Sequence, residues 1–332
     1  MHLSQLCKIR HIARRAIEGF FDGLGYTSVD APILVCSPGT EVYLDYFESS
    51  WLDVKHGRHT MFLRSSPEIH LKQALSYDLE KIYHLGKVFR NGGELAEWHH
   101  PEFTMLEWYE AGIDFFDYMQ QTQSLIEAVY YALHKADLGL NLIALPERFH
   151  RLSVFEAFER YAGITLIDQD EDLAKKALDK GFISVRADDD FETAYFKILL
   201  DVIEPRLKAL GAVFLYDYPA SQAALSQVID GKAKRFELYL NGIELCNAFF
   251  ELLNPLDNQK RIVEANEKRR LLNKQPVPLD QEFMGALSRG IPECCGNALG
   301  YDRLLASLLQ LPGIDSVIAF RTMQPYGDLS RS

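Results

Sequence analysis

Apolar residues recur every three or four positions in several segments of the chain, which predicts amphipathic helices. We expect these helices at 3–24, 67–76, 114–135, 153–163, 170–180, 190–210, 256–274, 279–289 and 301–309. Shorter apolar or alternating segments predict a strand over 29–35 that Pro32 breaks, and strands within 41–63 around a turn at Gly57. Further strands are expected at 82–90, 103–109, 213–218, 235–240, 243–252 and 296–299. The Asn241-Gly242 pair is a strong signal for a tight hairpin. Paired strands with helices between them predict an α+β fold built on an antiparallel sheet flanked by helices.

The composition narrows the class of protein. The chain has 332 residues, of which 47 are acidic and 35 basic, so its formal net charge is −12. That charge disfavours non-specific binding to nucleic acid, which depends on clustered Lys and Arg. The five cysteines show no metal-binding spacing, and no apolar run is long enough for a signal peptide or a transmembrane helix. We therefore expect a cytoplasmic protein with a single domain over 1–332 and no membrane partner.

A first group of candidate residues lies on the hairpin predicted from 82–90 and 103–109. Arg90 ends the first strand, while Phe103 and Glu107 share one face of the second strand. An arginine presents a planar fork to phosphate, and a phenylalanine ring can stack on a purine, so this combination is typical of a nucleotide site. The alternative is an ordinary amphipathic hairpin with a surface arginine.

A second group follows the chain through the Asn241-Gly242 turn. Glu237 and Glu244 flank this turn on opposite strands, where we expect them to face each other. Carboxylates inside an apolar strand are costly unless they are paired or bind a cation, and two of them suit Mg²⁺ that also binds substrate phosphates. The alternative is a half-exposed strand whose charges lie in water.

A third group is the Gly-rich segment 296–303, which is expected to join a strand to a helix. Glycines at such a junction allow close approach of a ligand to the backbone. Arg303, in the first turn of the helix, can then reach a phosphate or lie over a ring. Taken alone, such a Gly-rich segment is a weak signal, and a plain turn is the favoured alternative.

Taken together, the three groups resemble the class II aminoacyl-tRNA synthetases, specifically the lysine-specific catalytic domain. Segments 89–91 and 101–109 resemble the second signature motif of that family, and 296–303 resembles the third. Segment 243–252 is similar to its amino-acid-binding strand, and the first helix with 26–32 resembles its dimer-forming first motif. We expect no anticodon-binding domain, so the resemblance is greatest to free-standing paralogues that ligate (R)-β-lysine to elongation factor P.

The resemblance implies a role for each matching residue. Arg90 and Arg303 are expected to be catalytic, and Glu237 and Glu244 to hold Mg²⁺. The residues expected to bind ATP are Arg90, Asn91, Glu94, His99, His100, Phe103, Glu244, Leu245, Gly300 and Arg303. Those expected to bind the amino acid are Ser66, Glu68, Glu107, Tyr109, Asn247, Phe249, Glu251 and Ala298. The loop 92–100 departs from the family pattern.

The resemblance also implies ligands and partners. These are ATP, Mg²⁺, lysine or (R)-β-lysine, elongation factor P as the acceptor, and a second copy of the chain in a homodimer, with no tRNA. Two alternatives stay open. One is a shortened lysyl-tRNA synthetase that charges tRNA, and the other is a non-catalytic paralogue that binds an amino acid and regulates.

Overall fold

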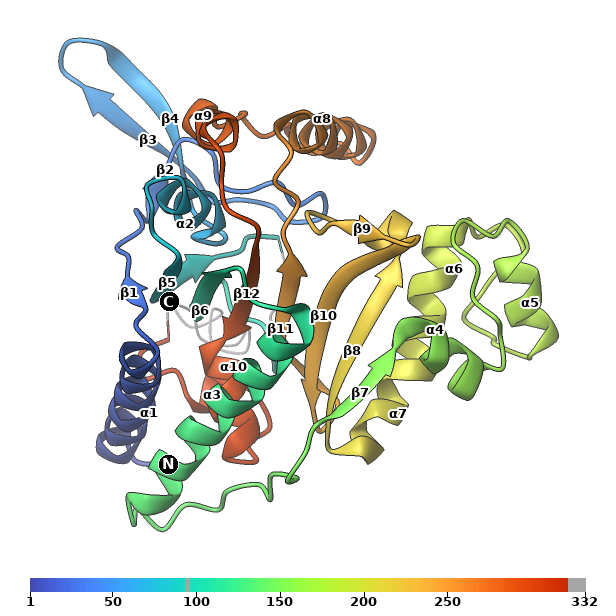
Figure 1. Cartoon of the computed structure of the whole chain (residues 1–332), viewed down its shortest axis with the longest axis horizontal. Coiled ribbons are helices and arrows are strands. Elements are labelled where there is room, and N and C mark those ends of the chain that lie inside the picture. The colour runs from blue at the N-terminus through green and yellow to red at the C-terminus, as the bar shows by residue number, and fades with distance from the viewer. Residues whose placement is uncertain (93–95, 322–332) are drawn as a thin grey trace, which may run out of the picture. The chain divides into compact units, whose positions relative to one another are not determined.

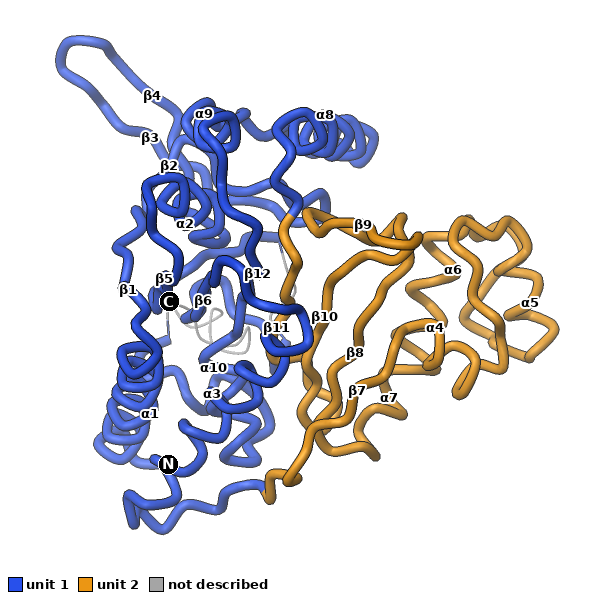
Figure 2. Tube along the Cα trace, in the orientation of Figure 1, with its two compact units in different colours: residues 1–143, 252–332 blue, residues 144–251 orange. Residues whose placement is uncertain are grey.

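The computed structural model describes residues 1–92 and 96–321, and these form two compact units (Figure 2). Unit 1 comprises residues 1–143 together with the chain from 252 onward, and unit 2 comprises residues 144–251. The chain therefore leaves unit 1, builds unit 2 and returns. Each unit is described separately below, and the single catalytic domain over 1–332 stays a prediction.

Unit 1 contains a four-stranded sheet in the order β1-β5-β6-β12. Its strands are β1 (Thr27–Ser28), β5 (Lys81–Phe89), β6 (Glu102–Ala111) and β12 (Cys294–Gly300). β6 is antiparallel to both of its neighbours, whereas β1 is parallel to β5. A second sheet has the order β2-β4-β3 and comprises β2 (Leu34–Val35), β3 (Glu48–Asp53) and β4 (Gly57–Leu63). Figure 1 shows β3 and β4 as a hairpin that projects from the rest of unit 1.

The helices of unit 1 agree with the apolar periodicity. They are α1 (Leu3–Gly23), α2 (Glu68–Leu75), α3 (Phe115–Lys135), α8 (Pro255–Leu271), α9 (Gln281–Arg289), α10 (Tyr301–Leu308) and the 3₁₀ turn η5 (Ile314–Ser316). α1 packs against α3, α2 packs against α9, and α10 packs against β6. The side chain of Asp114 accepts hydrogen bonds from the first backbone N–H groups of α3, which explains why this helix starts there.

Unit 2 contains a sheet in the order β11-β10-β8-β7, and β9 pairs with β10. Its strands are β7 (His150–Ser153), β8 (Ala212–Pro219), β9 (Val228–Ile229), β10 (Lys232–Leu240) and β11 (Ile243–Phe250). Its α-helices are α4 (Val154–Ala157), α5 (Leu173–Asp179), α6 (Phe191–Ile198) and α7 (Glu204–Leu207). Apolar residues of α4, α6 and β8 form the core of this unit.

Four further turns complete unit 2, and one of them has a clear cause. They are η1 (Phe158–Ala162), η2 (Leu199–Ile203), η3 (Lys208–Leu210) and η4 (Ala220–Gln222). The predicted helix over 190–210 is divided into α6, the wider turn η2, α7 and η3. Pro205 lies at the start of α7, and because proline has no N–H and its ring crowds the preceding turn, the helix widens just before it.

The strand predicted over 29–35 and broken by Pro32 forms only in part, at Leu34–Val35. Pro32 removes a ladder donor within the segment. Two pairs of strands are parallel, β1 with β5 and β7 with β8, and the pattern did not indicate either pair. β7 has only four residues, which is too short for a periodicity to be recognised. Within residues 1–92 and 96–321, no helix is long and apolar enough to cross a membrane.

Candidate functional site

The predicted nucleotide hairpin forms in unit 1 as β5 and β6, with Arg90 directly after β5. The backbone N–H of Arg90 donates to the carbonyl of Pro101 (3.0 Å), which holds Arg90 at the open end of the hairpin. Its guanidinium carbon lies 5.3 Å from the centroid of the Phe103 ring. The Nε atom of Arg90 is buried, and no described residue accepts a hydrogen bond from it. A buried donor of this kind suits an anionic ligand.

Arg303 approaches the same hairpin from the first turn of α10. Its guanidinium contacts His99 Nε2 (3.0 Å) and donates to the carbonyl of Trp98 (3.3 Å). Burial and the charges of Arg303 and Arg90 lower the pKa of His99, so its imidazole is neutral and accepts from Arg303. Two guanidinium groups are therefore concentrated around His99, which is the arrangement that a polyphosphate requires.

Three further predicted ATP residues of unit 1, His100, Gly300 and Asn91, have described contacts. His100 donates from Nδ1 to the carbonyl of Glu102 (2.9 Å), and its Nε2 is buried without a partner among the described residues. Gly300 is the last residue of β12, and an added Cβ there would lie 3.4 Å from the Arg303 side chain. Asn91 pairs with Asp45 through its backbone, and Glu94 lies outside the described residues.

A second cluster in unit 1 is built around the buried carboxyl of Glu107, which is 1% exposed. Ser66 Oγ and Tyr109 Oη each donate to it, both over 2.7 Å. Burial, and then the charge of Glu68, raises the pKa of Glu107 to about 8. Ala298 on β12 is the register partner of Glu107, so the two side chains share one face of the sheet. The cluster offers a carboxyl group to a cationic ligand.

Lys72 belongs to this cluster but was not predicted from the sequence. Its side chain is fully buried, and Nζ donates to Glu68 Oε1 over 2.6 Å. The spacing of four residues between Glu68 and Lys72 on a predicted helix was the available signal, since such pairs lie on one helical face. Burial of the lysine depends on packing of α2 against other elements, which a periodicity does not show.

In unit 2 the predicted carboxylates lie on the hairpin β10–β11, but they are not direct register partners. Glu237 pairs with Asn247 and Glu244 pairs with Tyr239, because an irregularity between Leu238 and Tyr239 shifts the register. Glu237 and Tyr239 are two residues apart on β10 and lie on one face. Glu244, opposite Tyr239, therefore lies on the same face as Glu237.

A third carboxylate, Glu204, completes this group and was not predicted. The hydroxyl of Tyr239 lies between the two carboxyl groups: it donates its one proton to Glu237 Oε2 (2.8 Å), and Glu204 Oε1 lies 3.0 Å from the same hydroxyl oxygen. Burial raises the pKa of Glu204 to about 7, and the charges of Glu237 and Glu244 add to the rise. Three acidic side chains thus share a partly buried region of unit 2.

The other predicted residues of unit 2 lie on β11 or just after it. Leu245 and Glu251 are each 1% exposed. The Asn247 side-chain oxygen is buried, and no described residue donates to it. Phe249 lies under a guanidinium, with its ring centroid 5.6 Å from the Arg235 Cζ atom. An amide oxygen and a carboxylate are both suited to binding an ammonium group.

The fit to Mg²⁺ depends on Glu237 and Glu244 together with a phosphate ligand. Within residues 1–92 and 96–321, no group of three or more His, Cys, Asp or Glu side chains is arranged to hold a metal ion. A carboxylate has about four lone-pair positions, and the Glu237 carboxylate uses two of them, for Arg235 and Tyr239. A pair of carboxylates of this kind fits Mg²⁺ when substrate phosphates supply further ligands.

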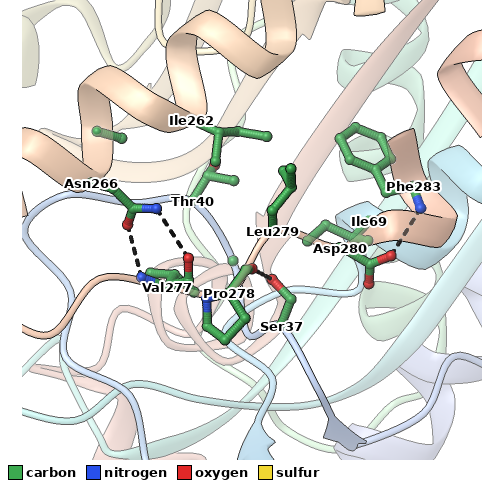
Figure 3. A pocket seen from close by; sticks show the side chains of 12 residues that line it. Ser37, Thr40, Ile69, Ile262, Asn266, Val277, Pro278, Leu279, Asp280 and Phe283 are labelled. Atoms are coloured by element: carbon green, nitrogen blue, oxygen red, sulfur yellow. Dashed lines mark hydrogen bonds between the residues drawn. The ribbon is translucent and has the colours of Figure 1, made fainter. Parts of the chain in front are cut away.

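A small cavity in unit 1 is not this site. It lies between α2, α8, α9 and the segments around Ser37 and Pro278, where Asn266 holds Val277 through two hydrogen bonds (Figure 3). Its volume of about 10 Å³ is at the lower limit for one water molecule. No residue that the sequence predicted for the site lines it.

Comparison with known proteins gives a consistent result. Over residues 1–324 the chain matches the family model described as tRNA synthetases class II (D, K and N). It is 34% identical over 319 residues, 94% of both chains, to the elongation factor P–(R)-β-lysine ligase of Photobacterium profundum. It is 33% identical over 324 residues to the Vibrio cholerae protein of that name, covering 96% of this chain and 95% of the relative. For the Salmonella heidelberg protein of that name, identity is 33% over 310 residues, covering 92% of this chain and 91% of the relative.

Proposed function

Because this chain belongs to the class II tRNA synthetases (D, K and N), we propose that it activates a lysine-type amino acid with ATP and transfers it to elongation factor P. The amino acid is (R)-β-lysine, and the acceptor is a lysine side chain. The observation that carries this proposal is found within unit 1. The guanidinium groups of Arg90 and Arg303 lie near His99. The carboxyl groups of Glu68, on α2, and Glu107, on β6, form a second cluster in the same unit.

The reaction has two steps. In the first, a carboxylate oxygen of the amino acid attacks the α-phosphorus of ATP, the bond to the β-phosphate oxygen breaks, and pyrophosphate leaves. Arg90 stabilises the negative charge on the reacting phosphate, and Arg303 binds the outer phosphates. In the second step, the amine of the acceptor lysine attacks the carbonyl carbon of the adenylate. An amide forms, AMP leaves and the amine loses a proton.

The chain's own side chains bind and orient the reactants, and none needs to act as a nucleophile. The family resemblance assigns adenine stacking to Phe103 and ATP binding to Asn91, Glu94, His99, His100, Leu245 and Gly300. Glu107, Glu251 and Tyr109 bind the side-chain ammonium, while Ser66, Glu68, Asn247, Phe249 and Ala298 bind the rest of the amino acid. Glu237 and Glu244 hold Mg²⁺, which neutralises phosphate charge when bound.

Intact-mass analysis of elongation factor P tests the reaction directly. We expect the factor to gain the mass of one lysyl residue when it is incubated with this protein, ATP, Mg²⁺ and (R)-β-lysine. Omission of ATP and substitution of the acceptor lysine are the controls, and both should abolish the gain. Aminoacylation of bulk tRNA instead would assign the chain to the tRNA-charging enzymes, which its net charge of −12 disfavours.

The proposal includes an assembly and a location. We propose a homodimer formed through the segment that resembles the first motif, and analytical ultracentrifugation tests it. We also propose that the enzyme works in the cytoplasm, where ATP is available. All five cysteines are free thiols, which agrees with a reducing compartment.

Binding of the amino acid should depend on pH through Glu107. Its raised pKa of about 8 means that the carboxyl holds a proton at pH 6 and must lose it to bind an ammonium. Affinity for the amino acid should therefore rise about tenfold for each pH unit up to about 8 and then level off. Calorimetric titrations at pH 6, 7 and 8 measure this rise. Glu107→Gln removes the titrating group, so a variant that keeps the wild-type profile would contradict the assignment.

Ala298 is expected to influence the choice between α-lysine and β-lysine. It faces Glu107 across β6 and β12, and one methyl group in a packed site is worth about 1–3 kcal/mol of discrimination. Ala298→Gly should therefore raise activation of α-lysine relative to (R)-β-lysine by about tenfold. Pyrophosphate exchange with both isomers measures the ratio in the variant and the wild type. If Ala298 only packs the sheet, the ratio will be unchanged.

A further inference from the structure

Arg235 on β10 contacts two residues that the sequence predicted for the site, Glu237 and Phe249, although Arg235 itself has been given no role above. Its side chain is only 13% exposed. One guanidinium nitrogen donates to Glu237 Oε1 over 2.5 Å, and another donates to the carbonyl of Gln222 over 3.0 Å. Its Cζ atom lies 4.2 Å from the ring centroid of Tyr218 and 5.6 Å from that of Phe249. The guanidinium is thus held between two rings and faces a carboxylate.

The contact between Arg235 and Glu237 fixes the direction of the carboxylate. Tyr239 Oη donates to the second oxygen of Glu237 over 2.8 Å, so each oxygen accepts one hydrogen bond. The remaining lone pairs are then directed away from Arg235 and Tyr239, and only they can accept a cation. Hydrogen-bonded partners of this kind orient carboxylate ligands in metal sites and tune their affinity.

Charge balance agrees with this arrangement. Glu204, Glu237 and Glu244 bring three carboxyl groups together, and each interacts electrostatically with Tyr239. Arg235 is the cation that bonds directly to one of them. Arg235 offsets one negative charge, and Glu237 and Glu244 remain the pair that would hold Mg²⁺ together with substrate phosphates. The planar fork also lets Arg235 bind Glu237 while its faces contact the rings, which a lysine cannot do.

We propose that Arg235 is a positioning residue, which orients Glu237 to receive Mg²⁺ and supports the Phe249 ring beside the amino acid. The inference rests on the proposed function, in which Glu237 is a metal ligand and Phe249 contacts the substrate. Its alternative is a purely structural arginine that joins β10 to the turn at Gln222.

Two substitutions separate these roles. Arg235→Lys keeps the charge but not the fork, and Arg235→Met removes both. Arg269→Lys is the matched control, because Arg269 is a buried arginine that donates to backbone carbonyls and lies 5.0 Å from the ring of Tyr46. None of its described contacts is with a residue that we place in the site.

The main measurement is Mn²⁺ affinity, followed by electron paramagnetic resonance in the presence of a non-hydrolysable ATP analogue. Both Arg235 variants should bind Mn²⁺ about 10- to 100-fold more weakly than the wild type. The free Mg²⁺ needed for half-maximal pyrophosphate exchange should rise by a similar factor. Arg269→Lys should lower the melting temperature and leave both metal readouts unchanged. Tyr239→Phe, which removes the other bond to Glu237, serves if Arg235→Met does not fold.

Wild-type Mn²⁺ affinity in a folded Arg235→Met protein would overturn the inference. So would a wild type that binds Mn²⁺ no more tightly than Glu237→Gln, since Glu237 would then have no metal role. The proposed reaction is tested separately, by pyrophosphate exchange of the wild type with (R)-β-lysine. If the wild type catalyses exchange, the proposed function holds even when the inference about Arg235 fails. If the wild type catalyses no exchange, the proposed function is wrong, whatever the Mn²⁺ titration gives.

Discussion

Replacing Arg90 with alanine is expected to lower the rate of adenylate formation by about 10²- to 10³-fold, as for loss of one donor that stabilises developing charge. The ground-state bond alone is worth roughly 1.5–3 kcal/mol because the acceptor is ionised. The fold should survive, because the Arg90 Nε atom has no partner among the described residues and the ring contact with Phe103 is modest. ATP–pyrophosphate exchange with (R)-β-lysine measures the loss.

The control for this substitution is Arg58→Ala. Arg58 lies on the exposed hairpin strand β4 and donates to Ser50 Oγ over 3.2 Å, away from the cluster around His99. Its removal should leave exchange at the wild-type rate. Near-normal exchange in a folded Arg90→Ala protein would refute the assigned role, because removal of a group that stabilises the reacting phosphate must slow adenylate formation.

Substitution of the buried carboxyls is expected to weaken amino-acid binding and to leave ATP binding almost unchanged. Glu107→Gln and Glu251→Gln each remove one partner of a buried charge pair, which costs about 2–5 kcal/mol. The KM for (R)-β-lysine should therefore rise by about 30-fold or more. Steady-state kinetics with each substrate varied in turn separates the two KM values.

Glu110→Gln is the matched control for these two variants. Glu110 is another mostly buried carboxyl of β6. It pairs with Lys81 Nζ (2.7 Å) and accepts a hydrogen bond from Tyr26 Oη (2.6 Å), and neither partner is a residue predicted for the site. Its loss should lower thermal stability without changing either KM. Equal increases in the KM values for ATP and the amino acid in Glu107→Gln or Glu251→Gln would show that the carboxyl is structural.

Local sequence was enough to predict most of the elements. The apolar period over 3–24 predicted α1, which ends at Gly23. The Asn241-Gly242 pair predicted the turn between β10 and β11, and both residues have the positive φ values that this turn requires, 52° and 84°. These features depend on side-chain period and turn chemistry within a few residues, so neighbours along the chain determine them.

The candidate site was only partly predictable. Residue types indicated a nucleotide, because the planar fork of Arg90 suits phosphate, and a cation, because carboxylates such as Glu237 are costly inside an apolar strand. The roles of these side chains came from the family resemblance, and the family itself is confirmed by the match over residues 1–324. Periodicity alone favoured an ordinary amphipathic hairpin at Arg90 and Glu107, and it left a half-exposed strand equally possible at Glu237.

Other features were decided by tertiary structure alone. Arg303 meets His99, the Lys72 side chain is fully buried, and Arg235 is flanked by Tyr218 and Phe249, and no local pattern indicates any of the three. The parallel pairing of β7 with β8 and the division of the chain into two units have the same origin. Each results from contacts between segments far apart in the chain, whose free energy depends on packing and desolvation in three dimensions rather than on any local pattern.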